Sequence, residues 1–110
     1  MNMKHILKIG LAMTVMLAMV APAMAMTMPT KTLWGGASST IQESKNGQTV
    51  TFVVSDPSGC LSSAVVSDVS NFGTPCKQIV ITASKTVKGT GKVTVFRNGV
   101  AGNVYPFKVV

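Results

Sequence analysis

The sequence has very few of the side chains that enzymes use for acid–base catalysis. It contains one histidine, His5, and three carboxylates, at Glu43, Asp56 and Asp68. The carboxylates are 12 or 13 residues apart, so no spacing along the chain pairs them. A Ser-His-Asp arrangement or a general base near neutral pH is therefore hard to build. We expect a protein that is not an enzyme and has no catalytic residues.

Side chains that bind metals or cofactors are also scarce. Met24, Met26 and Met28 alternate, and thioethers suit Cu(I). The cleavage proposed below would remove Met24, however, and leave only two methionines on a short leader. Phosphate-binding loops need a glycine-rich turn before a helix, whereas Gly89-Thr90-Gly91 precedes a predicted strand and is interpreted as a hairpin connection. We expect no metal and no cofactor.

Residues 1–25 have the three-part layout of a secretory signal peptide. Lys4 and Lys8 supply the positive start, an uncharged, largely apolar run covers 9–25, and Ala23-Met24-Ala25 is a small-residue cleavage site. The alternative is a membrane anchor, but 17 residues is at the lower limit for crossing a bilayer. No second long apolar run follows, so no integral membrane span is expected in the mature chain. We expect cleavage after Ala25 and a periplasmic or extracellular protein.

The mature chain has two cysteines, Cys60 and Cys76. An exported chain meets an oxidising compartment, so we expect these cysteines to form one structural disulfide. A disulfide that closes the loop between Cys60 and Cys76 would stabilise the fold by roughly 3 kcal/mol in the chain-entropy model. The alternatives are two free thiols or a redox-active or metal-binding pair, although the spacing is not that of a Cys-x-x-Cys motif.

Alternation of apolar and polar residues indicates an all-β fold. Val50, Phe52 and Val54 alternate with Thr49, Thr51 and Val53, which is typical of a strand with one buried face. Asn46-Gly47 is a strong turn signal. We expect a flexible leader at 26–32 and a single β-sandwich domain at 33–110, with Leu33 and Trp34 as its first core residues. The expected strands are 37–42, 48–55, 60–67, 77–83, 92–98 and 104–110, with a loop at 71–75.

Two stretches carry a resemblance to a known family. The segment KQIVITASKTVKGTGKVTVFRNGVAGNVYPFKVV, at 77–110, resembles the last three strands of a bacterial immunoglobulin-like domain, and GQTVTFVVSDPSG, at 47–59, is similar to its second strand. The cysteines do not bracket a central tryptophan, so the immunoglobulin disulfide pattern is not followed. The resemblance implies a small immunoglobulin-like β-sandwich of six to seven short antiparallel strands with an adhesive or spacer role at the cell surface.

The mature chain is basic, with eight basic and three acidic residues and a net charge of +5. Four cations fall within 13 residues on one predicted hairpin, and we consider them as candidates for an anion-binding patch: Lys85, Lys88, Lys92 and Arg97. The alternative is that these cations serve solubility and protect strand edges.

Three functions follow from these observations. The first is a structural or interaction module of the cell envelope or extracellular matrix, which pairs its strand edges with an unknown protein or with copies of itself. The second is a cationic binder of an anionic polymer, which would be lipopolysaccharide, acidic polysaccharide or nucleic acid. The third is a small inhibitor of an exported enzyme, which presents the loop between the two cysteines.

Overall fold

The computed structural model describes residues 25–110, and all of this part of the chain is strand, turn or loop. The predicted signal peptide lies outside the described residues except for Ala25. Within the described residues, no helix is long and apolar enough to cross a membrane. The seven strands are β1 (Lys31–Leu33), β2 (Ser38–Ser44), β3 (Val50–Ser55), β4 (Leu61–Asn71), β5 (Thr74–Ala83), β6 (Gly89–Arg97) and β7 (Val100–Val109).

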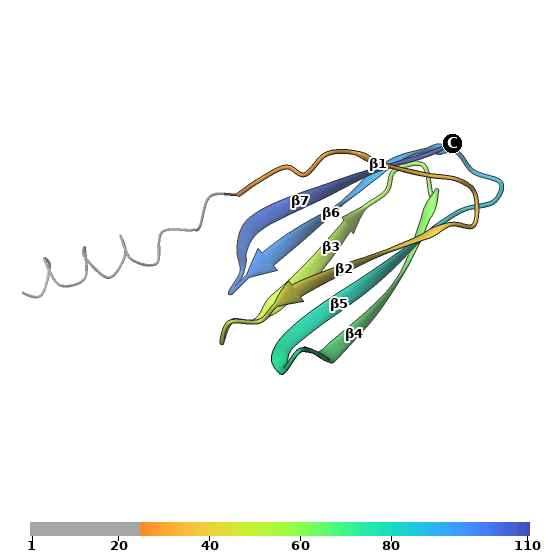
Figure 1. Cartoon of the computed structure of the whole chain (residues 1–110). Helices are drawn as coiled ribbons and strands as arrows, with labels where there is room; N and C mark the ends of the chain where they lie inside the picture. Colours follow the sequence, from red (N-terminus) through yellow and green to blue (C-terminus); the bar gives the residue numbers. More distant parts are fainter. Residues whose placement is uncertain (1–24) are drawn as a thin grey trace, which may run out of the picture.

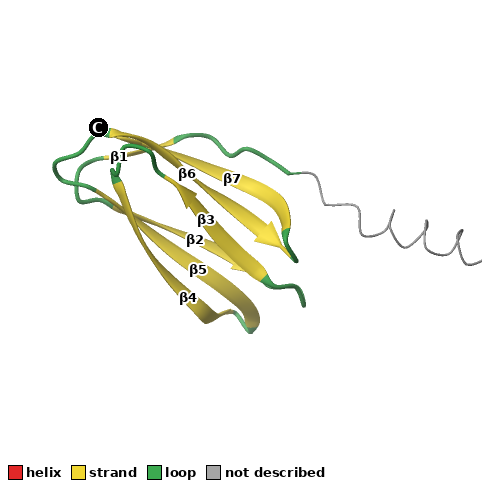
Figure 2. Cartoon of the chain, turned by 180° about the vertical axis from the view of Figure 1, so that it is seen from behind, coloured by secondary structure: helices red, strands yellow, loops and turns green. Residues whose placement is uncertain are grey.

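The strands form two sheets that lie face to face, as in a β-sandwich (Figures 1 and 2). One sheet has the order β1-β7-β6-β3 and the other has the order β2-β5-β4. β1 is parallel to β7, and all other neighbouring strands are antiparallel. The chain changes sheet after β1, β2, β3 and β5. The expected all-β architecture is therefore confirmed.

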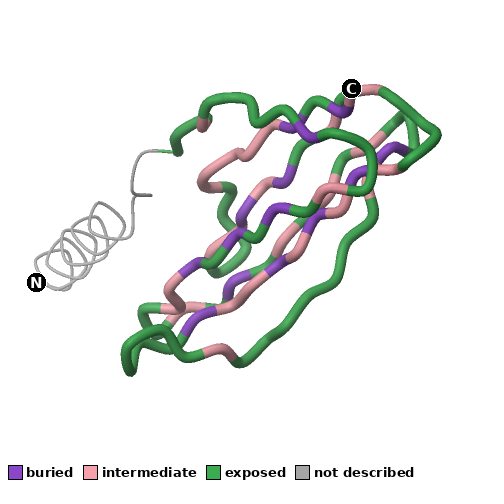
Figure 3. The backbone as a smooth tube through the Cα atoms, turned by 45° about the vertical axis from the view of Figure 1, so that its right-hand side comes forward, coloured by how far each residue is buried: buried purple, intermediate pink, exposed green. Residues whose placement is uncertain are grey.

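The core lies between the sheets and follows the period-2 pattern of the sequence. Ile79 and Ile81 on β5 and Val93 and Val95 on β6 are almost fully buried, and Val50 opens β3 with a buried side chain. In Figure 3, buried segments alternate with less buried ones along the strands. Alternation in the sequence also predicts three further inward faces, and these are confirmed together with that of β3: Ile79 and Ile81 on β5, Val93 and Val95 on β6, and Tyr105, Phe107 and Val109 on β7.

The β4–β5 hairpin is longer than the sequence indicated. The predicted loop at 71–75 is wrong, because Asn71 pairs with Thr74 and only Phe72 and Gly73 form the turn. Both turn residues have positive φ, at 49° and 80°. Phenylalanine rarely adopts this left-handed conformation, so the dipeptide carries no recognisable turn signal.

The segment Gly89-Thr90-Gly91 is also different from the prediction. It is the first part of β6 and pairs with β7, at Val109, Lys108 and Phe107, rather than forming a hairpin connection. A Cβ at Gly91 would lie 2.6 Å from Leu61 Cδ1 and 3.1 Å from the Ser55 carbonyl oxygen. Glycine is therefore needed here for close packing within a strand.

The N-terminal segment differs from the flexible leader expected at 26–32. The Met28 amide donates to the Val104 carbonyl oxygen at 2.8 Å, and the Val104 amide donates to the Met26 carbonyl oxygen at 2.9 Å. This segment runs beside β7 before β1 begins, because the edge of β7 offers unpaired backbone groups. Leu33 is buried as predicted, but Trp34 is 72% exposed, so its prediction as a core residue is wrong.

Candidate functional site

The two cysteines are free thiols and do not form the predicted disulfide. The Ser84 amide donates to the Cys60 carbonyl oxygen, whereas Cys76 pairs with Val69. Eight residues of chain separate Ser84 from Cys76, which is about 26 Å in a strand. A disulfide needs Cα atoms within about 7 Å. The long β4–β5 hairpin therefore holds the cysteines near its opposite ends.

We expect reductant to leave the stability of the protein unchanged, because no bridge constrains its unfolded state. Thiol titration of the denatured protein should find two free thiols per chain, and urea midpoints with and without dithiothreitol should agree. A bridge would instead add roughly 3 kcal/mol to the free energy of unfolding in the oxidised protein. A lower midpoint in dithiothreitol would contradict the structure.

Asp56 organises the turn that leads into β4. Its carboxylate accepts hydrogen bonds from the amides of Cys60, at 3.0 Å, and Leu61, at 2.9 Å. Burial alone would raise the pKa of Asp56, but these backbone hydrogen bonds outweigh it and hold the pKa below its usual value. Burial, and next the neighbouring Asp56 carboxylate, raises the pKa of the Cys60 thiol. Cys60 is thus an inert core residue rather than a nucleophile.

Arg97 lies in a polar cluster between the sheets. Its guanidinium contacts Glu43 Oε2 at 2.9 Å and donates to the Ser44 carbonyl oxygen at 2.6 Å. Tyr105 donates its hydroxyl to the other Glu43 oxygen. Burial, together with the hydrogen bond to Glu43, raises the pKa of Tyr105 to about 12. The cluster ties β2 to β6 and β7, so Arg97 has a structural role.

The four residues of the predicted anion-binding patch are not on one hairpin, because β5 and β6 belong to different sheets. Lys85 and Lys88 lie in the crossing loop between β5 and β6, and Lys92 is exposed on β6. Arg97 lies nine residues beyond Lys88, which is about 30 Å along a strand, and is already paired with Glu43. The structure instead places Lys108 beside the start of β6, since Lys108 pairs with Thr90.

The carboxylates of the described residues do not neutralise these lysines. Glu43 pairs with Arg97, and Asp68 pairs with Lys45 at 2.6 Å. Among residues 25–110, these are the two ion pairs, and no cluster of three potential metal-ligating side chains occurs. Lys85, Lys88, Lys92 and Lys108 are thus exposed cations without an acidic partner in the described part of the chain.

β4 forms one edge of the three-stranded sheet and is exposed along almost its whole length. Val65 and Val66 are 50% and 44% exposed, on opposite faces of the strand. Residues 61–66 carry no charge, whereas the second half of β4 has a bulge between Val66 and Val69 and contains Asp68. Bulges and charges hinder pairing with other strands, so the first half of β4 is its unprotected part.

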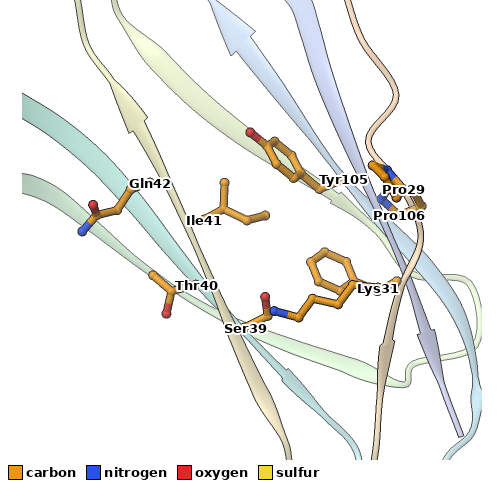
Figure 4. A pocket seen from close by; sticks show the side chains of 9 residues that line it. Pro29, Lys31, Ser39, Thr40, Ile41, Gln42, Tyr105 and Pro106 are labelled. Atoms are coloured by element: carbon orange, nitrogen blue, oxygen red, sulfur yellow. The ribbon is translucent and has the colours of Figure 1, made fainter.

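A hollow of about 340 Å³ lies between β2 and β7, on the other side of the sandwich. Figure 4 shows the Lys31 side chain extending toward Ser39, below the ring of Tyr105. The lining also includes Gln42 and Pro29, but no carboxylate, histidine or cysteine. These side chains can donate and accept hydrogen bonds, but they provide no nucleophile–base pair.

Sequence reasoning missed the surface side chains that stand out in the structure. Trp34, Phe72 and Val87 are exposed in turns or loops, and Val65 and Val66 are exposed on β4. Local hydrophobicity favoured burial for most of them. A usable signal was the Gly35-Gly36 pair after Trp34, because a turn at a sheet end leaves its first side chain free to face solvent.

Comparisons with known proteins show no family for this chain. No family model matches it, and no curated protein matches it. Among solved structures, it is similar to one titled "Solution Structure of Amebosin", with 27% sequence identity and a TM-score of 0.46. The match covers 79% of this chain and 97% of the other. A TM-score at this level supports no conclusion about fold or function.

Proposed function

We propose that the protein is a non-enzymatic, exported structural module of the cell envelope or extracellular matrix, which self-associates through β4. The observation that carries this proposal is the unpaired, uncharged edge at residues 61–66, with Val65 and Val66 exposed on opposite faces. An exposed, flat strand edge is a template for adding another strand.

We also propose that the topology is immunoglobulin-like. The order β2-β5-β4 corresponds to strands B, E and D of that fold, and β3, β6 and β7 correspond to C, F and G. The resemblance of residues 77–110 to bacterial immunoglobulin-like domains agrees with this correspondence. Domains of this kind suit a spacer or adhesive role because they are compact and present several free edges.

The occupant of the edge is a second copy of this chain. A two-fold axis at the middle of residues 61–66 brings β4 against β4 in antiparallel orientation, so residues near the axis face their equivalents and the others pair crosswise. Residues 61–66 contain no charge that would repel its own copy, and Asp68 is paired with Lys45. The neutral edge lets two molecules with net positive charge approach along this strand.

Sedimentation velocity of the purified protein tests the proposal. We expect a concentration-dependent monomer–dimer equilibrium with a similar dissociation constant at about 0.05 and 1 M NaCl, since backbone pairing is screened little by salt. Ala64→Lys should weaken the dimer about tenfold, because like charges then oppose each other across the axis.

The matched control is Ser70→Lys, which adds the same charge to β4 beyond its bulge. This variant should leave the dissociation constant within about twofold of the original. A protein that stays monomeric at every concentration would sink the proposal. Equal weakening by Ala64→Lys and Ser70→Lys would show that charge alone, rather than the first half of β4, controls association.

A further inference from the structure

One end of the sandwich gathers segments that are far apart in the sequence. The Gly36 amide donates to the Ala83 carbonyl oxygen at 2.9 Å, and the Ala83 amide donates to the Ala37 carbonyl oxygen at 2.8 Å. The Val110 amide donates to the Leu33 carbonyl oxygen at 3.0 Å. These bonds place the turn at 34–37, the loop at 84–88 and the end of β7 side by side (Figure 1). We call this end the basic tip.

The basic tip combines exposed apolar and cationic side chains. Trp34 is exposed in the turn, and Val87 is 38% exposed in the neighbouring loop. Lys85, Lys88 and Lys108 are exposed around them. The acidic side chain of this end, Asp56, is occupied by the amides of Cys60 and Leu61. The tip therefore presents an aromatic ring and an aliphatic side chain among lysines that have no acidic partner in residues 25–110.

The loops of the basic tip are held in place. Ser84 Oγ accepts hydrogen bonds from the amides of Thr86, at 3.1 Å, and Val87, at 3.0 Å. A Cβ at Gly36 would lie 3.1 Å from Lys85 Cε, so the turn packs closely against the Lys85 side chain. A fixed conformation lowers the entropy lost when a surface binds.

We propose that the basic tip docks the protein onto an anionic lipid surface, with Trp34 and Val87 entering the interface and the lysines contacting lipid phosphates. Tryptophan favours the membrane–water interface, and lysines are attracted to anionic lipid headgroups. An aromatic ring with lysines beside it therefore fits an anionic lipid surface. An anionic polymer would use the lysines but would leave Val87 without an apolar partner. The inference goes beyond self-association through β4, because it rests on Trp34, Val87 and the lysines, none of which lies on β4.

Trp34 is the single tryptophan of the sequence, so its fluorescence reports directly on docking of the basic tip. The protein obtained by expressing the full chain is titrated with phosphatidylglycerol vesicles and, in parallel, with phosphatidylcholine vesicles. We expect a blue shift of Trp34 fluorescence with the anionic vesicles only. An apolar segment elsewhere would bind both vesicle types, so the difference between them reports on charge and Trp34 together.

Matched variants locate the contact. Lys85→Ser with Lys88→Ser should lower the partition coefficient about 25-fold, at about fivefold for each lysine near an anionic surface. Trp34→Ala, followed by vesicle co-sedimentation, should lower it about tenfold. Lys45→Ser and Phe72→Ala are the controls, because they remove a cation and an exposed aromatic ring at the opposite end of the sandwich. Each control should change binding less than twofold.

Three results would overturn the inference. Equal binding to neutral and anionic vesicles would remove the role of the lysines. Loss of binding in Phe72→Ala as large as in Trp34→Ala would place the contact at the other end. Tight binding to soluble polyphosphate, without a Trp34 blue shift on anionic vesicles, would identify the partner as an anionic polymer rather than a lipid surface.

Discussion

Replacing Arg97 with alanine is expected to lower the free energy of unfolding by about 3 kcal/mol, because a nearly buried carboxylate then loses its counter-ion. The Glu43 side chain is 10% exposed and the Arg97 side chain is 25% exposed. The same guanidinium also donates to the Ser44 carbonyl oxygen and to Gln48. The variant leaves these acceptors and the Glu43 charge without their donor. Urea unfolding followed by circular dichroism measures the loss.

The second ion pair of the described residues supplies the control. The Lys45 and Asp68 side chains are 28% and 92% exposed, so Lys45→Ala should cost less than about 1 kcal/mol. Both variants remove one positive charge, but Arg97→Ala leaves a nearly buried carboxylate and two further acceptors, whereas Lys45→Ala leaves an exposed carboxylate. Equal effects would show that Glu43 is solvated in solution and that the cluster between the sheets is not formed.

Ile81→Ala is expected to lower the free energy of unfolding by about 3–4 kcal/mol. Ile81 has no exposed surface, and β5 is the central strand of the three-stranded sheet. Its side chain packs in the core cluster with residues of the facing sheet, including Val93 and Phe107. Removing it leaves a cavity between two sheets that cannot easily collapse. Such a loss is a large part of the total stability of a small domain.

Val66→Ala is the matched substitution on the same sheet. Val66 is a β-branched residue on β4, but it is half exposed, so the loss should stay below about 1 kcal/mol. Denaturation of both variants under the same conditions gives the comparison. A loss for Val66→Ala as large as that for Ile81→Ala would mean that a partner or a second copy already covers this face of β4.

The structural role of Arg97 makes its replacement a poor test of anion binding. Arg97 was one of four cations expected to bind an anion, but its bonds to Glu43 and Ser44 give it a structural role. An Arg97 variant would weaken binding by unfolding the protein, and this loss would resemble the loss of a contact. Lys85 and Lys88 are exposed, so their replacement tests binding without this complication.

The strands that the sequence predicted well are those with strict alternation. Residues Val50–Ser55 form β3, and the buried sets on β5, β6 and β7 match the predicted faces. The Asn46-Gly47 and Asn98-Gly99 turns have the positive φ values that these residue types favour. These features depend on neighbours a few residues away, so local chemistry is enough to predict them. The signal peptide at 1–25 and export remain predictions.

The sequence alone thus determined the all-β class, the inward faces of the main strands and the scarcity of catalytic groups. Only the tertiary structure decided which side chains share a surface. Lys88 directly precedes β6 and Arg97 ends it, so the two cations lie at opposite ends of a strand, while Lys108 joins the same end as Trp34. The pairing of β4 with β5 separates Cys60 from Cys76. Strand pairing joins residues that are distant in sequence, and apolar alternation contains no information about which strands become neighbours.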